Sequence, residues 1–136
     1  MTAEDLLAFL RERLDDDENT ARYAIQAGGD GQWTEPASGV VDLSQGPDAG
    51  LEGLLAIDDH RISRHIVHYN PARVLAEVAS KRAIIDELWA ELRYASDPVT
   101  VESCDEDSAV LAQRALLLLA LPYATHPGYQ EGWKPQ

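Results

Sequence analysis

The side chains that could bind a metal ion are four histidines and a single cysteine. Three of the histidines are close together, and the remaining ligands follow far along the chain: His60, His65, His68, Cys104 and His126. A structural zinc site needs about four nitrogen or sulfur ligands, and its sequence spacings are usually tight. These spacings are not tight, so we favour hydrogen bonding at helix ends and between helices for the rings. We expect no metal and no cofactor.

Nucleophilic catalysis would need an activated side chain with a base beside it. Cys104 is the only thiol, and it lies in a strongly acidic segment, where the thiolate is disfavoured. Carboxylates are abundant, but their abundance in an acidic protein does not define an acid–base pair. The sequence therefore predicts no catalytic residue, and we interpret the protein as a non-enzyme.

A basic stretch in the middle of the chain could serve recognition. It has only one acid, Glu77, between its ends and consists of Arg61, Arg64, Arg73, Lys81 and Arg82. One interpretation is a surface for phosphate or for an acidic partner. The other, which we favour, is that these cations meet acids of the first helix and of residues 97–107. Arg82 falls near an apolar stripe, where a cation usually finds an acid or covers apolar surface with its stem.

The elements that must position these residues follow from apolar periodicity and from breaks at Gly and Pro. Together they predict a mostly helical α+β fold in one domain over residues 1–136. The expected elements are a helix over 2–26, a small antiparallel β hairpin or three-stranded meander within 31–57, helices over 58–69 and 71–95, an acidic loop over 97–107, a buried helix over 105–121 and an aromatic tail over 122–136.

Capping residues mark several of these boundaries. Thr2 with Asp5 makes a short capping box for the first helix, and either Asp58 or Asp59 caps the helix over 58–69. Asn70, followed by proline, starts the next helix, so we expect the chain to bend there.

The last helix is apolar on nearly every side toward its end, which predicts a place in the middle of the core. The aromatic tail after it is expected to fold back over that core.

Composition limits the classes of function. The 136 residues are 45% hydrophobic, as in folded proteins, and the net charge of -13 argues against general nucleic-acid binding. No apolar run reaches the roughly 18 residues that a membrane span needs. The single cysteine excludes an intramolecular disulfide. We expect a cytoplasmic protein with no membrane association.

Three stretches resemble a known family: LLAFLRERLDDDENTAR, HIVHYNPARVLAEVASKRAIID and LALPYATHPGYQEGW. They are similar to small actinobacterial and actinophage proteins of unknown function. In the middle motif Tyr69 intervenes before Asn70, and many relatives carry several cysteines spaced like a zinc site where this chain has only Cys104. The resemblance implies no activity, and no catalytic residue can be transferred.

Three hypotheses follow. The first is a non-enzymatic interaction protein that uses its acidic surface or an exposed helix face to bind another protein, such as a host or defence factor. Its candidate interaction residues are His65, His68, Arg73 and Arg82. The second is a virion or self-assembling structural protein, hence a homo-oligomer. The third is a metal-binding module or metal-dependent enzyme that uses the histidines.

Overall fold

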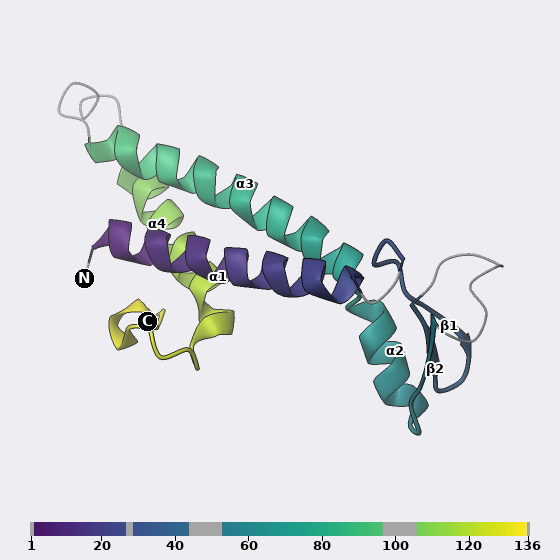
Figure 1. Cartoon of the computed structure of the whole chain (residues 1–136). Coiled ribbons are helices and arrows are strands. Elements are labelled where there is room, and N and C mark those ends of the chain that lie inside the picture. Colours follow the sequence, from purple (N-terminus) through teal and green to yellow (C-terminus); the bar gives the residue numbers. More distant parts are fainter. Residues whose placement is uncertain (1, 27–28, 44–52, 97–105, 136) are drawn as a thin grey trace. The chain divides into compact units, whose positions relative to one another are not determined.

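The computed structural model describes residues 2–26, 29–43, 53–96 and 106–135. The elements are α1 (Ala3–Ile25), β1 (Thr34–Ala37), β2 (Val40–Asp42), β3 (Leu54–Ala56), α2 (His60–His68), α3 (Pro71–Ser96), α4 (Glu106–Ala120) and the short 3-10 helices η3 (Leu121–Tyr123) and η4 (Glu131–Trp133) (Figure 1). The predicted α+β fold, mostly helical with a small antiparallel sheet after the first helix, is confirmed. Residues 97–105, most of the predicted acidic loop, lie outside the described ranges.

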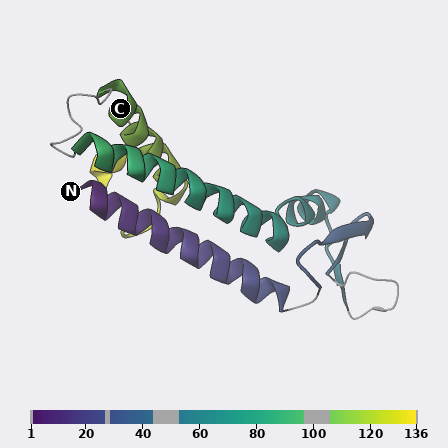
Figure 2. The same cartoon turned by 90° about the horizontal axis from the view of Figure 1, so that it is seen from above.

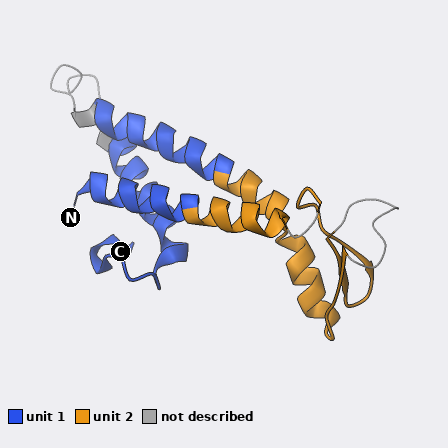
Figure 3. Cartoon of the chain, in the orientation of Figure 1, with its two compact units in different colours: residues 1–15, 79–136 blue, residues 16–78 orange. Residues whose placement is uncertain are grey.

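The chain divides into two compact units (Figure 3). Unit 1 contains residues 1–15 and 79–136, and unit 2 contains residues 16–78. Both α1 and α3 therefore begin in one unit and end in the other. The single domain over 1–136 stays a prediction.

The core of unit 1 is built on the apolar stripe of α1. Leu10 and Leu14 are each 1% exposed, as is Ile85 of α3, and Leu116 of α4 is fully buried. Within this unit α1 and α3 lie side by side in both views (Figures 1 and 2). The spacing of four between Leu10 and Leu14 puts them on one helical face, so α1 can bury both at once.

The prediction that the last helix lies in the middle of the core is wrong for α4, which is buried along one face only. Ala112, Leu116 and Ala120 are buried, but the opposite face is exposed, with Leu111 67% and Leu118 51% accessible. The apolar composition of a helix shows which side chains it could bury, but actual burial depends on the elements packed against it. Within unit 1, α4 packs through one face only. No helix in the described ranges has both the length and the apolar character to cross a membrane.

The aromatic tail folds back onto α1, as predicted. Phe9 lies at the centre of this packing, with its ring centroid 5.0 Å from that of Trp133 and 6.0 Å from that of Tyr129. Tyr123 and His126 contact the same ring at 6.4 and 5.7 Å. Offset and edge-on aromatic pairs at these distances stabilise beyond their buried area, so the tail is part of the unit 1 core.

In unit 2 the three strands form an antiparallel meander in the order β1-β2-β3. Val41 of the central strand is fully buried and pairs with Leu55 of β3. Ser63 is the buried residue of α2, and its hydroxyl donates to the Glu35 carboxylate on β1 and to the carbonyl of His60. The hydrogen bond to Glu35 joins α2 to the sheet.

The predicted caps are present. The backbone N–H of Thr2 donates to the Asp5 carboxylate at 2.8 Å, and the N–H of Asp5 donates to the Thr2 hydroxyl at 3.1 Å. Of the two aspartates proposed for α2, Asp59 is the cap. Asn70 caps α3 by accepting the backbone N–H of Arg73 at 2.9 Å.

Candidate functional site

The bend between α2 and α3 is fixed by the residues that end one helix and start the next. The backbone N–H of Tyr69 donates to the carbonyl of His65 at 3.0 Å and closes α2. Asn70 works in both directions: its side-chain amide donates to the carbonyl of Val67 at 3.0 Å, while its oxygen caps α3. The side chains around the bend are therefore held on a defined backbone.

Tyr69 is the centre of a cluster of polar rings and a cation at this bend. The centroids of the His65 and His68 rings lie 4.8 and 5.0 Å from that of Tyr69. The guanidinium carbon of Arg73 lies 4.5 Å from the same ring centroid, a cation–π distance. Tyr69 is nevertheless 49% exposed. We call His65, His68, Tyr69 and Arg73 the Tyr69 cluster.

The guanidinium of Arg73 is held in place by two further contacts. Its Nε donates to the Glu77 carboxylate at 2.8 Å, an ion pair between positions four residues apart on α3. Its Nη1 donates to the carbonyl of His68 at 3.3 Å. Arg73 is thus oriented across the face of Tyr69 before any partner arrives.

The stretch of sequence that carries the Tyr69 cluster contains bases and no acids. No Asp or Glu occurs from His60 to Ala76, although the chain has 24 acids. Arg61 lies 2.6 Å from the Asp59 carboxylate, and hydrogen bonds from its side chain and then its backbone N–H hold the pKa of Asp59 below its ordinary value. Arg64 is exposed and has no ion-pair partner among the described residues.

Arg82 does not share a unit with the Tyr69 cluster, because it belongs to unit 1 and the cluster to unit 2. Its guanidinium lies 2.5 Å from the Asp15 carboxylate, in the acidic run of α1. Within unit 1 this is the internal compensation that the acidic first helix suggests. The structure therefore brings together three of the four residues proposed for interaction, His65, His68 and Arg73.

The weaker metal candidates are dispersed. His126 contacts the guanidinium of Arg13 in unit 1, and Cys104 lies outside the described residues. His60 begins α2 and is exposed. In the described ranges no three His, Cys, Asp or Glu side chains are grouped so that they could hold a metal ion.

Tyr69 is the member of the cluster that sequence reasoning did not single out as a site residue. The signal was present: Tyr69 lies four residues after His65 and four before Arg73, and residues at this spacing meet on a helix. The helix break at Asn70 hides the signal, since the spacing then runs across two elements.

Comparison with known proteins adds the family. A model of a family of unknown function (DUF6221) matches residues 3–135, nearly the whole chain. No curated protein matches, and no solved structure matches. The predicted resemblance to an uncharacterised family is confirmed. The chain belongs to the family of unknown function DUF6221.

Proposed function

We propose that this protein is a non-enzymatic interaction protein that binds another protein through the Tyr69 cluster. The observation that carries the proposal is that Tyr69 is half exposed yet held between two imidazoles and an oriented guanidinium. Tyrosine and arginine are enriched among residues that dominate binding energy. Side chains already ordered in the free protein lose less conformational entropy on binding, which favours affinity.

The chemistry of the surface favours a partner segment that is acidic and carries an aromatic or aliphatic side chain. Arg61 and Arg64 extend the positive charge along α2, and the nearest acids in sequence are Asp59 and Glu77. The net charge of -13 opposes an acidic partner only weakly at physiological salt, because acids that lie more than the Debye length of about 8 Å from the contact are largely screened.

Site-directed photocrosslinking tests whether a partner reaches this surface. A photoreactive phenylalanine replaces Tyr69 in one variant and Tyr23, which is 77% exposed, in the control. In cells of the encoding organism we expect one protein to be crosslinked from position 69 and not from position 23. No crosslinked protein, together with no partner recovered from the same cells at low salt, would contradict the proposal.

Binding of the purified partner then tests the residues. We expect Tyr69→Ala and Arg73→Ala each to raise the Kd about tenfold or more, the loss typical of a dominant interface residue. Arg22→Ala is the matched control, because Arg22 is a 63% exposed cation of the same unit outside the cluster. Unchanged affinity in both cluster variants, with helicity preserved, would move the interface elsewhere.

Self-assembly is a second candidate, and the outer face of α4 favours it. That face exposes three large apolar side chains, Val110, Leu111 and Leu118, and Leu121 of η3, which follows α4 directly, is exposed as well. Contiguous apolar patches of this kind often mark protein interfaces. Light scattering distinguishes the two candidates: a strict monomer at high concentration removes self-assembly, whereas an oligomer that Leu111→Lys dissociates supports it.

A further inference from the structure

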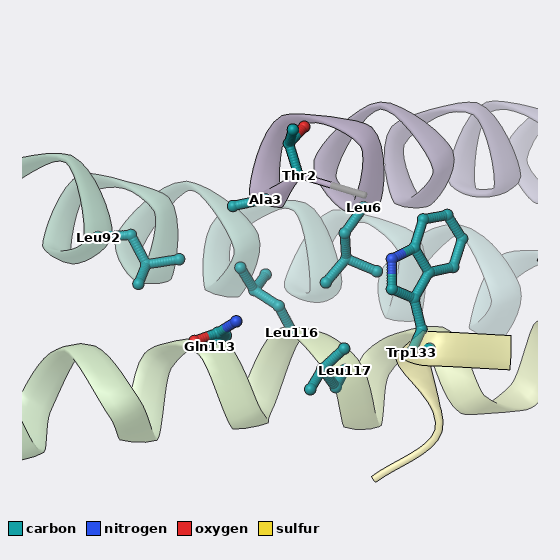
Figure 4. A pocket seen from close by; sticks show the side chains of 9 residues that line it. Thr2, Ala3, Leu6, Leu92, Gln113, Leu116, Leu117 and Trp133 are labelled. Carbon is teal, nitrogen blue, oxygen red and sulfur yellow. The ribbon is translucent and has the colours of Figure 1, made fainter. Parts of the chain in front are cut away.

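A pocket of about 100 Å³ lies within unit 1, between the start of α1, the end of α3, α4 and the C-terminal turn η4 (Figure 4). Its lining includes four leucines and two side chains with N–H donors: Leu6, Leu92, Leu116, Leu117, Gln113 and Trp133. Thr2, Ala3 and Gly132 line the rest. A cavity of about 150 Å³ lined by apolar side chains can bind benzene. The pocket has about two thirds of that volume, which leaves room for an aliphatic chain of roughly four carbons.

Trp133 provides an unused hydrogen-bond donor at this pocket. The residue is 2% exposed, and its indole Nε1 is buried without a hydrogen-bond partner among the described residues. In Figure 4 the nitrogen lies on the edge of the indole that faces the pocket. A buried N–H left unpaired is unfavourable, and buried donors in native proteins nearly always have partners. A ligand acceptor in the pocket would satisfy it.

A shallower groove continues from the pocket and supplies positive charge. The two share Gln113, Leu117 and Gly132, and the groove is also lined by Arg114 and Lys134. Lys134 lies 2.6 Å from the Glu131 carboxylate, but Arg114 has no ion-pair partner among the residues described. Leucine side chains in the pocket and a cation in the groove next to it are suited to a ligand with a short aliphatic chain and a negatively charged end.

We propose that the pocket binds a small aliphatic carboxylic acid of about four to six carbons, independently of the Tyr69 cluster. The chain lies among the leucines, and the carboxylate sits where pocket and groove meet, beside Gln113. There it accepts the Trp133 indole N–H and faces Arg114, whose charge selects an anion over a neutral molecule of the same shape. For so few atoms the expected Kd is on the order of 0.1 to 1 mM.

The probe is 3-methylbutanoate, followed through the indole N–H resonances in ¹⁵N-resolved NMR. Trp133→Phe assigns the Trp133 resonance. We expect that resonance alone among the three tryptophans to shift and saturate. Acetate, which lacks the aliphatic chain, and 3-methylbutanol, which lacks the carboxylate, are expected not to saturate it. No saturable shift, or equal binding of the alcohol, would overturn the proposal.

Two arginine variants test the groove without disturbing the core. Arg114→Gln is expected to weaken 3-methylbutanoate binding at least threefold, and Arg93→Gln, which removes another exposed cation of unit 1, to leave it unchanged. Equal effects of the two substitutions would overturn the role of Arg114.

N-acetyl-leucine tests the source of the carboxylate. We expect it to bind no more tightly than 3-methylbutanoate. A complex that is tenfold tighter would show that the pocket binds the C-terminal residue of a polypeptide and not a free carboxylic acid.

Discussion

Arg82 of α3 and Asp15 of α1 form an ion pair with 2.5 Å between guanidinium nitrogen and carboxylate oxygen. A second ion pair joins the same two helices with the charges exchanged: the guanidinium of Arg11 on α1 lies 3.3 Å from the carboxylate of Asp86 on α3. Along α1 Arg11 comes before Asp15, whereas along α3 the partner of Arg11, Asp86, comes after the partner of Asp15, Arg82. Within unit 1 the two helices are therefore antiparallel, and the reciprocal pairs fix their register.

The pair between Arg82 and Asp15 should contribute modestly and in a salt-dependent way. Their side chains are 38% and 64% exposed, so we expect a coupling free energy of about 0.2 to 1 kcal/mol in a double-mutant cycle of Arg82→Ala and Asp15→Ala. Arg82→Ala should cost more than Asp15→Ala, because the arginine stem also covers apolar surface. Urea unfolding at low and high salt measures the cycle. A coupling that high salt leaves unchanged would contradict a screened surface pair.

The contact of Phe9 with four rings of the tail predicts a large loss of stability on truncation. Phe9→Ala should reduce the free energy of unfolding by about 3 to 5 kcal/mol, because it leaves a cavity at the centre of the cluster. Leu111→Ala in the same unit is the control, with an expected change within about 0.5 kcal/mol, since that side chain is 67% exposed. Similar losses in the two variants would show that the tail does not depend on Phe9.

The parts of the fold predicted from sequence are those set by local chemistry. Asn70 and the proline after it fix the bend because both the capping hydrogen bond and the restriction on φ act within three residues. The capping box of Thr2 and Asp5 is equally local. The fold-back of the tail could be predicted because aromatic side chains have few other places to be buried.

The parts that escaped prediction depend on residues far apart in the sequence. Ser63 is fully buried because its hydroxyl meets Glu35, 28 positions earlier, and no periodic pattern identifies a buried serine. The outer face of α4 has the composition of a core helix, and only the arrangement of its neighbours leaves Leu111 and Leu118 exposed. The pocket beside Trp133 likewise joins elements from both ends of the chain.

The cap of α2 predicts a dependence of stability on pH. Hydrogen bonds from the side chain and backbone of Arg61 lower the pKa of Asp59 in the folded state. A carboxyl whose folded pKa is depressed contributes stability above its unfolded pKa, and this contribution is lost as the pH falls through the folded value. Asp59→Ala should therefore destabilise α2 at neutral pH, and the difference from the wild type should shrink in acid.

Thermal unfolding of the wild type and Asp59→Ala between neutral pH and the acid range checks this. Asp58→Ala is the matched control, because Asp58 precedes the cap and is exposed. A gap between wild type and Asp59→Ala that stays constant across the acid range would mean that the charge of the cap does not contribute.

The turn between β1 and β2 should not tolerate a side chain at Gly39. Its φ is 78°, a left-handed conformation that residues with a Cβ rarely adopt, and a Cβ placed there would lie 2.5 Å from the carbonyl oxygen of Ile57. The carbonyl of Gly39 also accepts the N–H of Ile57 at 2.6 Å, so any shift that relieves the clash breaks this hydrogen bond. We expect Gly39→Ala to cost about 2 kcal/mol or more.

Hydrogen exchange locates that loss. In Gly39→Ala the amide of Ile57 should exchange much faster than in the wild type, while Ser38→Ala, at the exposed neighbouring position of the same turn, should leave the rate unchanged. Because β2 lies between β1 and β3, loosening this turn should also reduce protection of the buried Val41 amide. If Gly39→Ala kept the wild-type exchange rate at Ile57, the left-handed conformation would not be needed to hold the meander together.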